Sequence, residues 1–128
     1  MRLLLDTCTF LWLVLESPQL SSGAEERFRD PDNETFLSAV SVWEIVLKYD
    51  LGRLPLPEKP LDLISRYRRQ LQVESLPLKE AEVLGVSRLP AIHRDPFDRM
   101  LISQAIAEGM TILTPDEDIR RYPVMTTW

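Results

Sequence analysis

The sequence predicts an α/β fold of three layers, α/β/α, with a central parallel sheet of four to five strands. Short apolar segments alternate with longer segments of helical periodicity along the whole chain, which is typical of a parallel sheet covered by helices on both faces. The apolar segments have the length of buried strands. The chain has 128 residues, of which 45% are hydrophobic and 27% charged. These values suit one domain, residues 1–128, with its own core.

The N-terminal half is predicted to supply most of the strands and helices. Apolar runs that end at acids or turn formers mark the strands, and apolar residues recurring every three or four positions mark the helices. Prolines make residues 54–60 a connector. The expected elements are, in order, a strand at 3–5, a helix through Phe10 to Leu15, a helix from Ser21 or Ser22 to Phe28, a turn at 30–33, a strand at 35–39, a helix from Ser41 to Gly52, a helix at 61–71 and a strand at 72–76.

The C-terminal half is centred on one well-marked helix. Asp95 is a natural N-cap, Pro96 suits the first helical position, and Gly109 suits the C-terminal cap. The expected elements here are a short helix at 79–87, the helix after Asp95, a strand at 110–113, a short helix opened by Asp116 and an edge strand at 124–127.

The apolar run from Leu3 to Leu15 also raises the question of a signal peptide or a membrane anchor. Asp6 interrupts the run, and the run ends at Glu16, short of the ~20 residues that a spanning helix needs. A lone cysteine, Cys8, cannot form an internal disulfide. We therefore expect a cytoplasmic protein with no membrane association. The net charge of -5 argues against a protein that coats nucleic acid, so any phosphate binding must be local.

Four acidic residues are predicted to meet at one edge of the sheet. In open parallel sheets, sites form beyond the carboxyl ends of the strands. Asp6 directly follows the first strand, Asp116 comes soon after the strand at 110–113, and Asp98 lies in the first turn of its helix. Glu44 lies within an apolar helix face, which keeps its carboxylate close to the sheet.

Each of these acids also has a simpler explanation. Asp6, Asp98 and Asp116 could cap helices, and Glu44 could pair with Lys48 one turn later. Two carboxylates ~4 Å apart repel by about 4 kcal/mol at an effective dielectric of roughly 20, so a gathering of four needs a cation. Oxygen ligands select Mg2+ or Mn2+, and the shortage of His and Cys excludes an ordinary zinc site. Such an ion would suit phosphate chemistry.

Other side chains receive ordinary interpretations. The only histidine, His93, is expected to be a surface loop residue, and Cys8 a small buried one. The three tryptophans are expected to be core or partner-interface residues. No Gly-x-Ser-x-Gly elbow or glycine-rich phosphate loop is present.

The pattern resembles the PIN-domain ribonucleases, and among them the VapC-type toxins of toxin-antitoxin systems. The resemblance spans nearly the whole chain and rests on four motifs in the family's order and spacing. They are LLLDT at 3–7, SVWEIVLK at 41–48 followed by LGRLPL at 51–56, HRDPFDRMLISQA at 93–105, and LTPDEDIRRY at 113–122.

This resemblance implies an activity and a catalytic set. The family's acidic quartet falls on Asp6, Glu44, Asp98 and Asp116, whereas Asp95 resembles the helix cap. The implied protein is a Mg2+- or Mn2+-dependent endoribonuclease that cuts single-stranded or loop RNA of the tRNA or rRNA class, with a metal-activated water as nucleophile. The three aspartates would hold the metal, and Glu44 would bind it through water or accept the proton of the attacking water.

The resemblance also implies supporting residues and partners. Thr114 and Ser41 resemble hydroxyls that orient the acids. A VapB-like antitoxin is expected to bind apolar residues of the early helices, such as Trp12 and Leu13, and a homodimer is expected by analogy. The arginines near the acidic edge, which could hold flanking phosphates, are Arg94, Arg99, Arg120 and Arg121.

Two other functions stay open at this point. A phosphatase of the haloacid dehalogenase type also has apolar residues running into an aspartate, but it usually has a second aspartate two residues later, where this chain has Cys8. The other alternative is a PIN-like binding module, which would have the same fold but whose acids would no longer act in catalysis.

Overall fold

A computed structural model describes residues 1–128, and it contains a five-stranded parallel sheet in the order β3-β2-β1-β4-β5. The strands are β1 (Arg2–Leu5), β2 (Glu34–Ser38), β3 (Glu74–Leu76), β4 (Thr111–Leu113) and β5 (Thr126–Thr127). The helices are α1 (Thr7–Val14), α2 (Ser22–Arg29), α3 (Ala39–Asp50), α4 (Pro60–Leu71), α5 (Glu80–Gly85), α6 (Pro96–Glu108) and α7 (Glu117–Arg120), with a 3-10 turn at Val86–Arg88.

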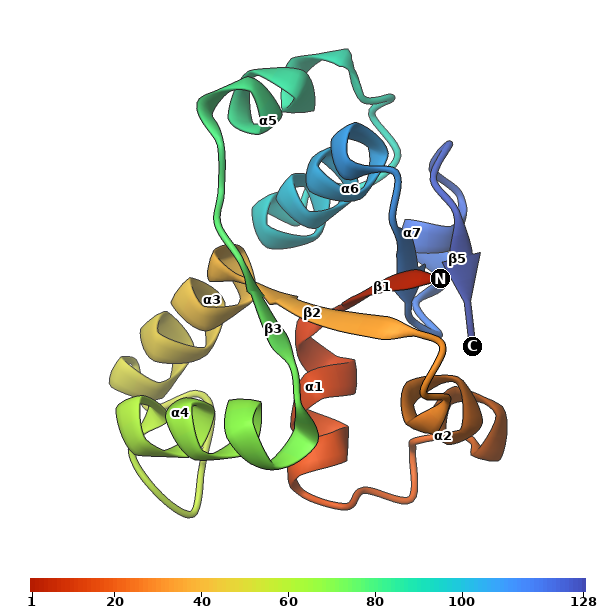
Figure 1. Cartoon of the computed structure of the whole chain (residues 1–128). Coiled ribbons are helices and arrows are strands. Elements are labelled where there is room, and N and C mark those ends of the chain that lie inside the picture. The colour runs from red at the N-terminus through yellow and green to blue at the C-terminus, as the bar shows by residue number, and fades with distance from the viewer.

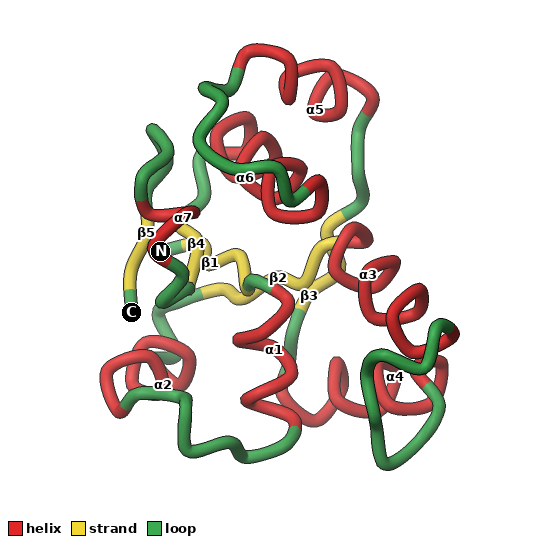
Figure 2. The backbone as a smooth tube through the Cα atoms, turned by 180° about the vertical axis from the view of Figure 1, so that it is seen from behind, coloured by secondary structure: helices red, strands yellow, loops and turns green.

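Helices cover both faces of the sheet. Helices α5 and α6 lie on one face, and α1, α2 and α4 lie on the other (Figure 1). The view from behind shows the strands gathered between these two groups (Figure 2). Each face has its own apolar core, one around Leu4 and Leu101, the other around Phe10 and Leu37. The predicted three-layer α/β/α fold is therefore confirmed. No helix has both the length and the apolar character needed to cross a membrane.

All predicted helices and strands are present, with small differences at their ends. The strand expected at 72–76 begins only at Glu74, because Gln72 ends α4 in a left-handed conformation with φ of 55°. The helix expected at 79–87 ends as α-helix at Gly85 and continues as the 3-10 turn. The helix expected from Ser41 begins two residues earlier, because Ser38 caps it.

Ser38 and Gln104 form a buried connection between β2 and α6. The Ser38 hydroxyl donates to the side-chain oxygen of Gln104, and it accepts from the amide of Val40 at 3.0 Å. The Gln104 amide in turn donates to the carbonyl of Pro77 at 3.3 Å. Because α6 carries Asp98 in its first turn, this connection helps to fix the position of that acid relative to the sheet.

We expect Ser38→Ala to lower the free energy of unfolding by about 2 kcal/mol, since it removes a helix cap and leaves a buried amide oxygen unpaired. Urea denaturation measures this change. Ser65→Ala is the matched control, because the Ser65 hydroxyl bonds only the exposed carbonyl of Leu61 and its loss should change stability by less than about 0.5 kcal/mol. Equal effects of the two substitutions would contradict the assigned role of Ser38.

Candidate acidic site at the carboxyl edge of the sheet

Asp6 lies where β1 passes into α1. Strands β1 and β4 are neighbours with Leu5 opposite Leu113, so the next residues, Asp6 and Thr114, also lie side by side. The Thr114 hydroxyl donates to one oxygen of Asp6, and the amide of Thr9 donates to the other at 2.7 Å. The carboxylate is 5% exposed, and this burial raises its pKa despite both hydrogen bonds, with a smaller contribution from Asp116. Asp6 is thus both an N-cap and a buried acid whose charged form lacks solvation.

Asp116 lies beyond the end of β4 and is exposed. Its amide donates to the Thr114 hydroxyl at 3.0 Å, so one threonine connects Asp6 and Asp116. One carboxylate oxygen of Asp116 accepts from the amides of Asp118 and Ile119 and caps α7. The second oxygen has no hydrogen bond within the chain and stays available.

Asp98 lies in the first turn of α6. Asp95 supplies the N-cap by accepting from the amides of Phe97 and Asp98, and the Asp98 carboxylate makes no capping hydrogen bond, so the simpler explanation of Asp98 as a capping residue is wrong. The Asp98 carboxylate instead lies 3.0 Å from Nε2 of His93. Burial raises the pKa of Asp98 to about 6, the His93 contact opposes this rise, and the carboxylates of Asp95, Asp116 and Glu44 add to it.

Glu44 lies on α3 and is 6% exposed. One of its oxygens forms an ion pair with Lys48, as the simpler explanation predicted. The other oxygen, Oε1, is buried and has no hydrogen-bond partner. An unpaired buried polar atom costs about 1–3 kcal/mol, so this oxygen lies in an environment that favours a cation or a donor.

The electric fields of the four acids overlap. Asp6 is influenced by Asp116, and Asp98 by both Asp116 and Glu44. Partial desolvation of the thiol by neighbouring residues, followed by the carboxylates of Asp6, Glu44 and Asp98, raises the pKa of Cys8 to about 11, although the residue as a whole is exposed. The four acids therefore occupy one region at the carboxyl edge, although no three acidic, histidine or cysteine side chains come close enough to enclose an ion.

The donor set in this region fits a hard divalent cation. It consists of carboxylate oxygens, three of which have no partner within the chain: Glu44 Oε1, the outer oxygen of Asp116 and Oδ1 of Asp98. The raised pKa of Asp6 and of Asp98 indicates acids whose charges the chain itself does not compensate. Because the region runs from buried Asp6 to exposed Asp116, a solvent-borne phosphate could reach it.

Two hydroxyls, those of Thr114 and Ser41, were predicted to orient the acids, and one of them does so. Thr114 holds Asp6 as the resemblance implied, whereas Ser41 accepts a hydrogen bond from the Thr7 hydroxyl at 3.0 Å. Ser41 therefore connects the first turns of α3 and α1 and does not bond any of the four acids.

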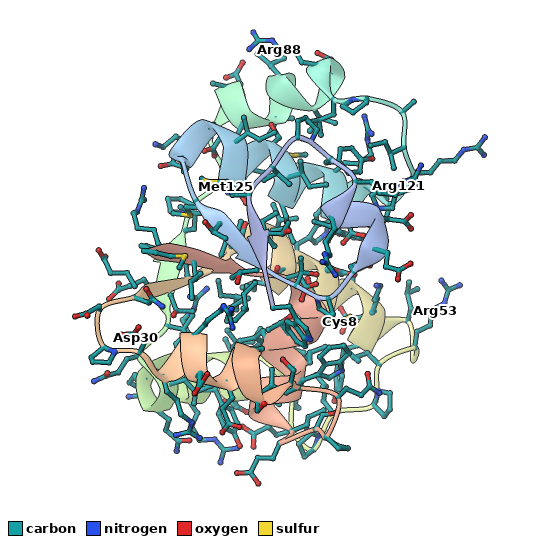
Figure 3. The ribbon with its side chains drawn as sticks, turned by 90° about the vertical axis from the view of Figure 1, so that its right-hand side faces the viewer. Cys8, Asp30, Arg53, Arg88, Arg121 and Met125 are labelled. Carbon is teal, nitrogen blue, oxygen red and sulfur yellow. The ribbon has the colours of Figure 1, made fainter.

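Three further sequence-based interpretations are wrong. His93 is not a free surface residue but a partly buried neighbour of Asp98. Cys8, expected to be buried, is exposed at the start of α1 and lies near the middle of the view in Figure 3, with Arg121 above it. Arg99 is not available for phosphate, because its guanidinium donates to the carbonyl of Pro90 at 2.8 Å and to the Tyr122 hydroxyl at 2.9 Å. The spacing of His93 five residues before Asp98 was the only sequence signal for their contact.

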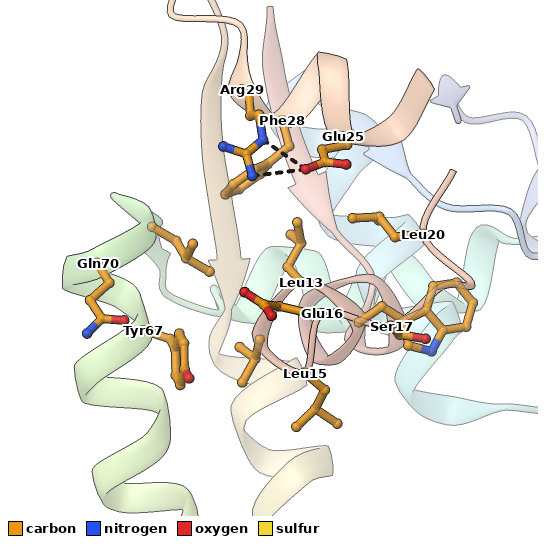
Figure 4. A pocket seen from close by; sticks show the side chains of 13 residues that line it. Leu13, Leu15, Glu16, Ser17, Leu20, Glu25, Phe28, Arg29, Tyr67 and Gln70 are labelled. Atoms are coloured by element: carbon orange, nitrogen blue, oxygen red, sulfur yellow. Dashed lines mark hydrogen bonds and ion pairs between the residues drawn. The ribbon is translucent and has the colours of Figure 1, made fainter. Parts of the chain in front are cut away.

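A separate groove of about 610 Å³ lies against the other end of α1. Its apolar lining includes Trp12, Leu13, Leu20, Phe28 and Tyr67. Figure 4 shows Leu13 with Tyr67 of α4 on one side and Leu20 on the other, and the ion pair of Arg29 and Glu25 of α2 above them. Two of its residues, Trp12 and Leu13, are those that the sequence singled out for a partner.

Comparisons with known proteins agree with this fold. The PIN domain family matches residues 3–125. Ribonuclease VapC16 of Mycobacterium tuberculosis (strain ATCC 25618 / H37Rv) is 29% identical over 119 residues, which cover 84% of this chain and 74% of that protein.

Solved structures show the same architecture at low sequence identity. A chain of VapBC2 from Rickettsia felis, bound to a DNA fragment from their promoter, aligns over 100% of this chain and 99% of that one, with a TM-score of 0.74 and 17% identity. A chain of DNA-bound VapBC from Salmonella typhimurium aligns over 99% and 97%, with a TM-score of 0.73 and 18% identity. The chain therefore belongs to the PIN domain family.

Proposed function

We propose that this protein is a metal-dependent endoribonuclease toxin that cuts single-stranded or loop RNA and is neutralised by a cognate antitoxin. The observation that carries the proposal is the electrostatic coupling of Asp98 to Asp116 and Glu44 at the carboxyl edge, with a buried oxygen of Glu44 left unpartnered. A VapC relative that is named a ribonuclease supports the reaction class. PIN-domain membership supports a divalent ion, and the oxygen donors favour Mg2+ or Mn2+.

Different residues of the site are proposed to bind the metal ion, to orient a carboxylate and to contact phosphates. Asp6, Asp98 and Asp116 would hold the ion, which when bound would neutralise the phosphate and lower the pKa of a water molecule. Thr114 keeps the Asp6 carboxylate oriented through its hydroxyl. Arg94 and Arg120, both exposed, remain candidates for contacts with flanking phosphates.

Glu44 is proposed to accept the proton of the attacking water. Lys48 occupies one oxygen of this carboxylate, which leaves Oε1 as the oxygen free to take a proton. In-line attack of the water on phosphorus would break the bond to the 3′ oxygen. The products would be a 5′-phosphate and a 3′-hydroxyl.

Incubation of the purified protein with a structured RNA and with p-nitrophenyl phosphate, both in Mg2+, tests this function. We expect cut RNA with the ends named above and no release of phosphate from the monoester. Phosphate release without RNA cutting would favour the haloacid dehalogenase alternative. Metal binding without either activity would favour a PIN-like module that only binds.

The antitoxin is proposed to occupy the groove lined by Trp12 and Leu13, since an apolar groove between helices suits an amphipathic peptide segment. The solved relatives are VapBC assemblies, which supports a protein partner of this kind. We also propose that the protein forms a homodimer and is located in the cytoplasm.

We expect Leu13→Arg to weaken antitoxin binding by at least about tenfold, because it places a charge in an apolar contact. Pull-down and calorimetry with the cognate antitoxin measure this loss. RNA cleavage should stay within about twofold, since the groove lies away from the acids. A variant that binds the antitoxin as tightly as the wild type would exclude this groove.

A further inference from the structure

The side chain of His93 belongs to a hydrogen-bond network that none of the catalytic proposals uses. Its Nε2 lies 3.0 Å from Oδ2 of Asp98, and its Nδ1 lies 2.8 Å from the hydroxyl of Tyr122. The same hydroxyl lies 2.9 Å from the guanidinium of Arg99 and 3.2 Å from the amide of His93 itself. Tyr122 is 4% exposed and packs in the core beside α6, so the network has a rigid base.

Counting donors fixes the direction of every bond in this network. The guanidinium of Arg99 and the amide of His93 can only donate, so they use the two acceptor positions of the Tyr122 oxygen. The single proton of the hydroxyl then goes to Nδ1 of His93 at 2.8 Å, which is much nearer than the other acceptor, the carbonyl of His93 at 3.4 Å. A neutral imidazole that accepts at Nδ1 carries its proton on Nε2, and Nε2 faces Asp98.

We infer that His93 is a positioning residue, which donates its Nε2 proton to Oδ2 of Asp98 and holds that carboxylate in the orientation for metal binding. This inference rests on the proposed function. The network occupies one oxygen of Asp98 and leaves the other for an ion. It also anchors the first turn of α6 to Tyr122, which follows α7, so that Asp98 and Asp116 are held by connected elements.

The His93 contact also favours the charged form of Asp98, which metal binding requires. Burial works against the ionised form of Asp98, and the His93 contact is the one side-chain hydrogen bond that favours it. Loss of an outer partner of this kind typically weakens metal binding by about 10–100-fold.

Nitrogen NMR of the imidazole tests the direction of the network without any activity. Because His93 is the only histidine, its signals need no assignment. Although desolvation by burial lowers the pKa of His93, the hydrogen bonds to Asp98 and Tyr122 raise it above its ordinary value, so the spectrum is recorded at about pH 9. There we expect the pattern of a ring protonated on Nε2 in the metal-free wild type. In Tyr122→Phe the preference for this tautomer should be lost. A ring protonated on Nδ1 in the wild type would overturn the inference.

Metal binding and kinetics test the role. We expect His93→Ala to raise the dissociation constant for Mn2+, measured by electron paramagnetic resonance on folded protein, by about tenfold. kcat for RNA cleavage should fall while KM for RNA stays unchanged, because the network touches Asp98 and not the substrate. His93→Gln should recover much of the loss, since its amide can replace the donor.

Tyr49→Phe is the matched control for Tyr122→Phe. The Tyr49 hydroxyl makes no hydrogen bond within the chain, and the residue lies near the C-terminal end of α3, outside the acidic region and the antitoxin groove, so Mn2+ binding and cleavage should not change. A wild type that binds Mn2+ and cuts RNA, with His93→Ala equal to it in both, would overturn the role of His93 alone. A wild type that does neither would overturn the proposed function together with this role.

Discussion

Asp98→Asn should abolish RNA cleavage, with a loss of at least about 10³-fold in kcat/KM. The substitution keeps the shape of the side chain but removes the charge that would meet the ion, and a contribution of ~4 kcal/mol to transition-state stabilisation corresponds to this factor. Gel analysis of a structured RNA under single-turnover conditions measures the effect. Circular dichroism should show an unchanged fold, because Asp95 and not Asp98 caps α6.

Asp62→Asn is the control for this substitution. Asp62 is also an aspartate in the first turn of a helix, but it is exposed on α4, away from the acidic edge. The rate of RNA cleavage by Asp62→Asn should equal that of the wild type. Unchanged cleavage by Asp98→Asn would count decisively against the assignment of Asp98.

Asp98→Asn should also raise the free energy of unfolding of the metal-free protein at neutral pH. The pKa of Asp98 is about 6 in the folded chain, above its ordinary value, so the charged form is disfavoured by folding. The resulting loss of stability is absent at low pH, develops as the pH rises toward 6 and is complete above it. After discounting for partial exposure, Asp98→Asn in EDTA should gain about 1–2 kcal/mol at pH 8, and the gain should vanish near pH 4. Urea denaturation at both pH values measures the difference.

Removal of divalent metal should abolish cleavage as completely as the loss of Asp98. With EDTA in excess we expect RNA cleavage to fall by at least about 10³-fold, because no other group in the region offers a positive charge to the scissile phosphate or activates water. Lys48 is the cation nearest to Glu44, and it is already paired. Addition of Mg2+ or Mn2+ beyond the chelator should restore the rate.

EDTA saturated with Mg2+ before addition is the control for this experiment. It contains the same chelator but withdraws no metal, so the rate should equal that in Mg2+ alone. Cleavage that persists after dialysis against free EDTA would mean that the acids serve the fold and not the reaction.

The parts of the site that follow directly from the chain direction could be predicted from the sequence. Asp6 and Asp116 come just after two strands that are neighbours in the sheet, and parallel strands place their carboxyl ends at one edge. The caps at Asp95 and Gly109 depend on local backbone geometry, which residue type specifies well. Glu44 was placed by a different argument: the apolar residues around it recur with helical period, and such a helix packs its apolar face against the sheet.

The contacts that depend on distant segments could not be predicted. His93 contacts Tyr122, which lies 29 positions later, and no local pattern specifies that pairing. Cys8 is exposed and lies within the electrostatic influence of Asp6, Glu44 and Asp98, and its small size gave no indication of this position. Trp43, which was expected in a core or an interface, is 57% exposed and lies edge-on to Phe97 at 4.9 Å, beside the acidic edge.

Direct titration of Mn2+ into the metal-free protein, without RNA, is the sharpest test of the acidic site. It measures whether the carboxylates of Asp6, Glu44, Asp98 and Asp116 act as one cation site. The wild type should bind the ion, and Asp6→Asn and Asp116→Asn should each weaken binding by at least about tenfold, although the two residues are far apart in the sequence. Binding that is absent from the wild type, or equally tight in both variants, would contradict the account.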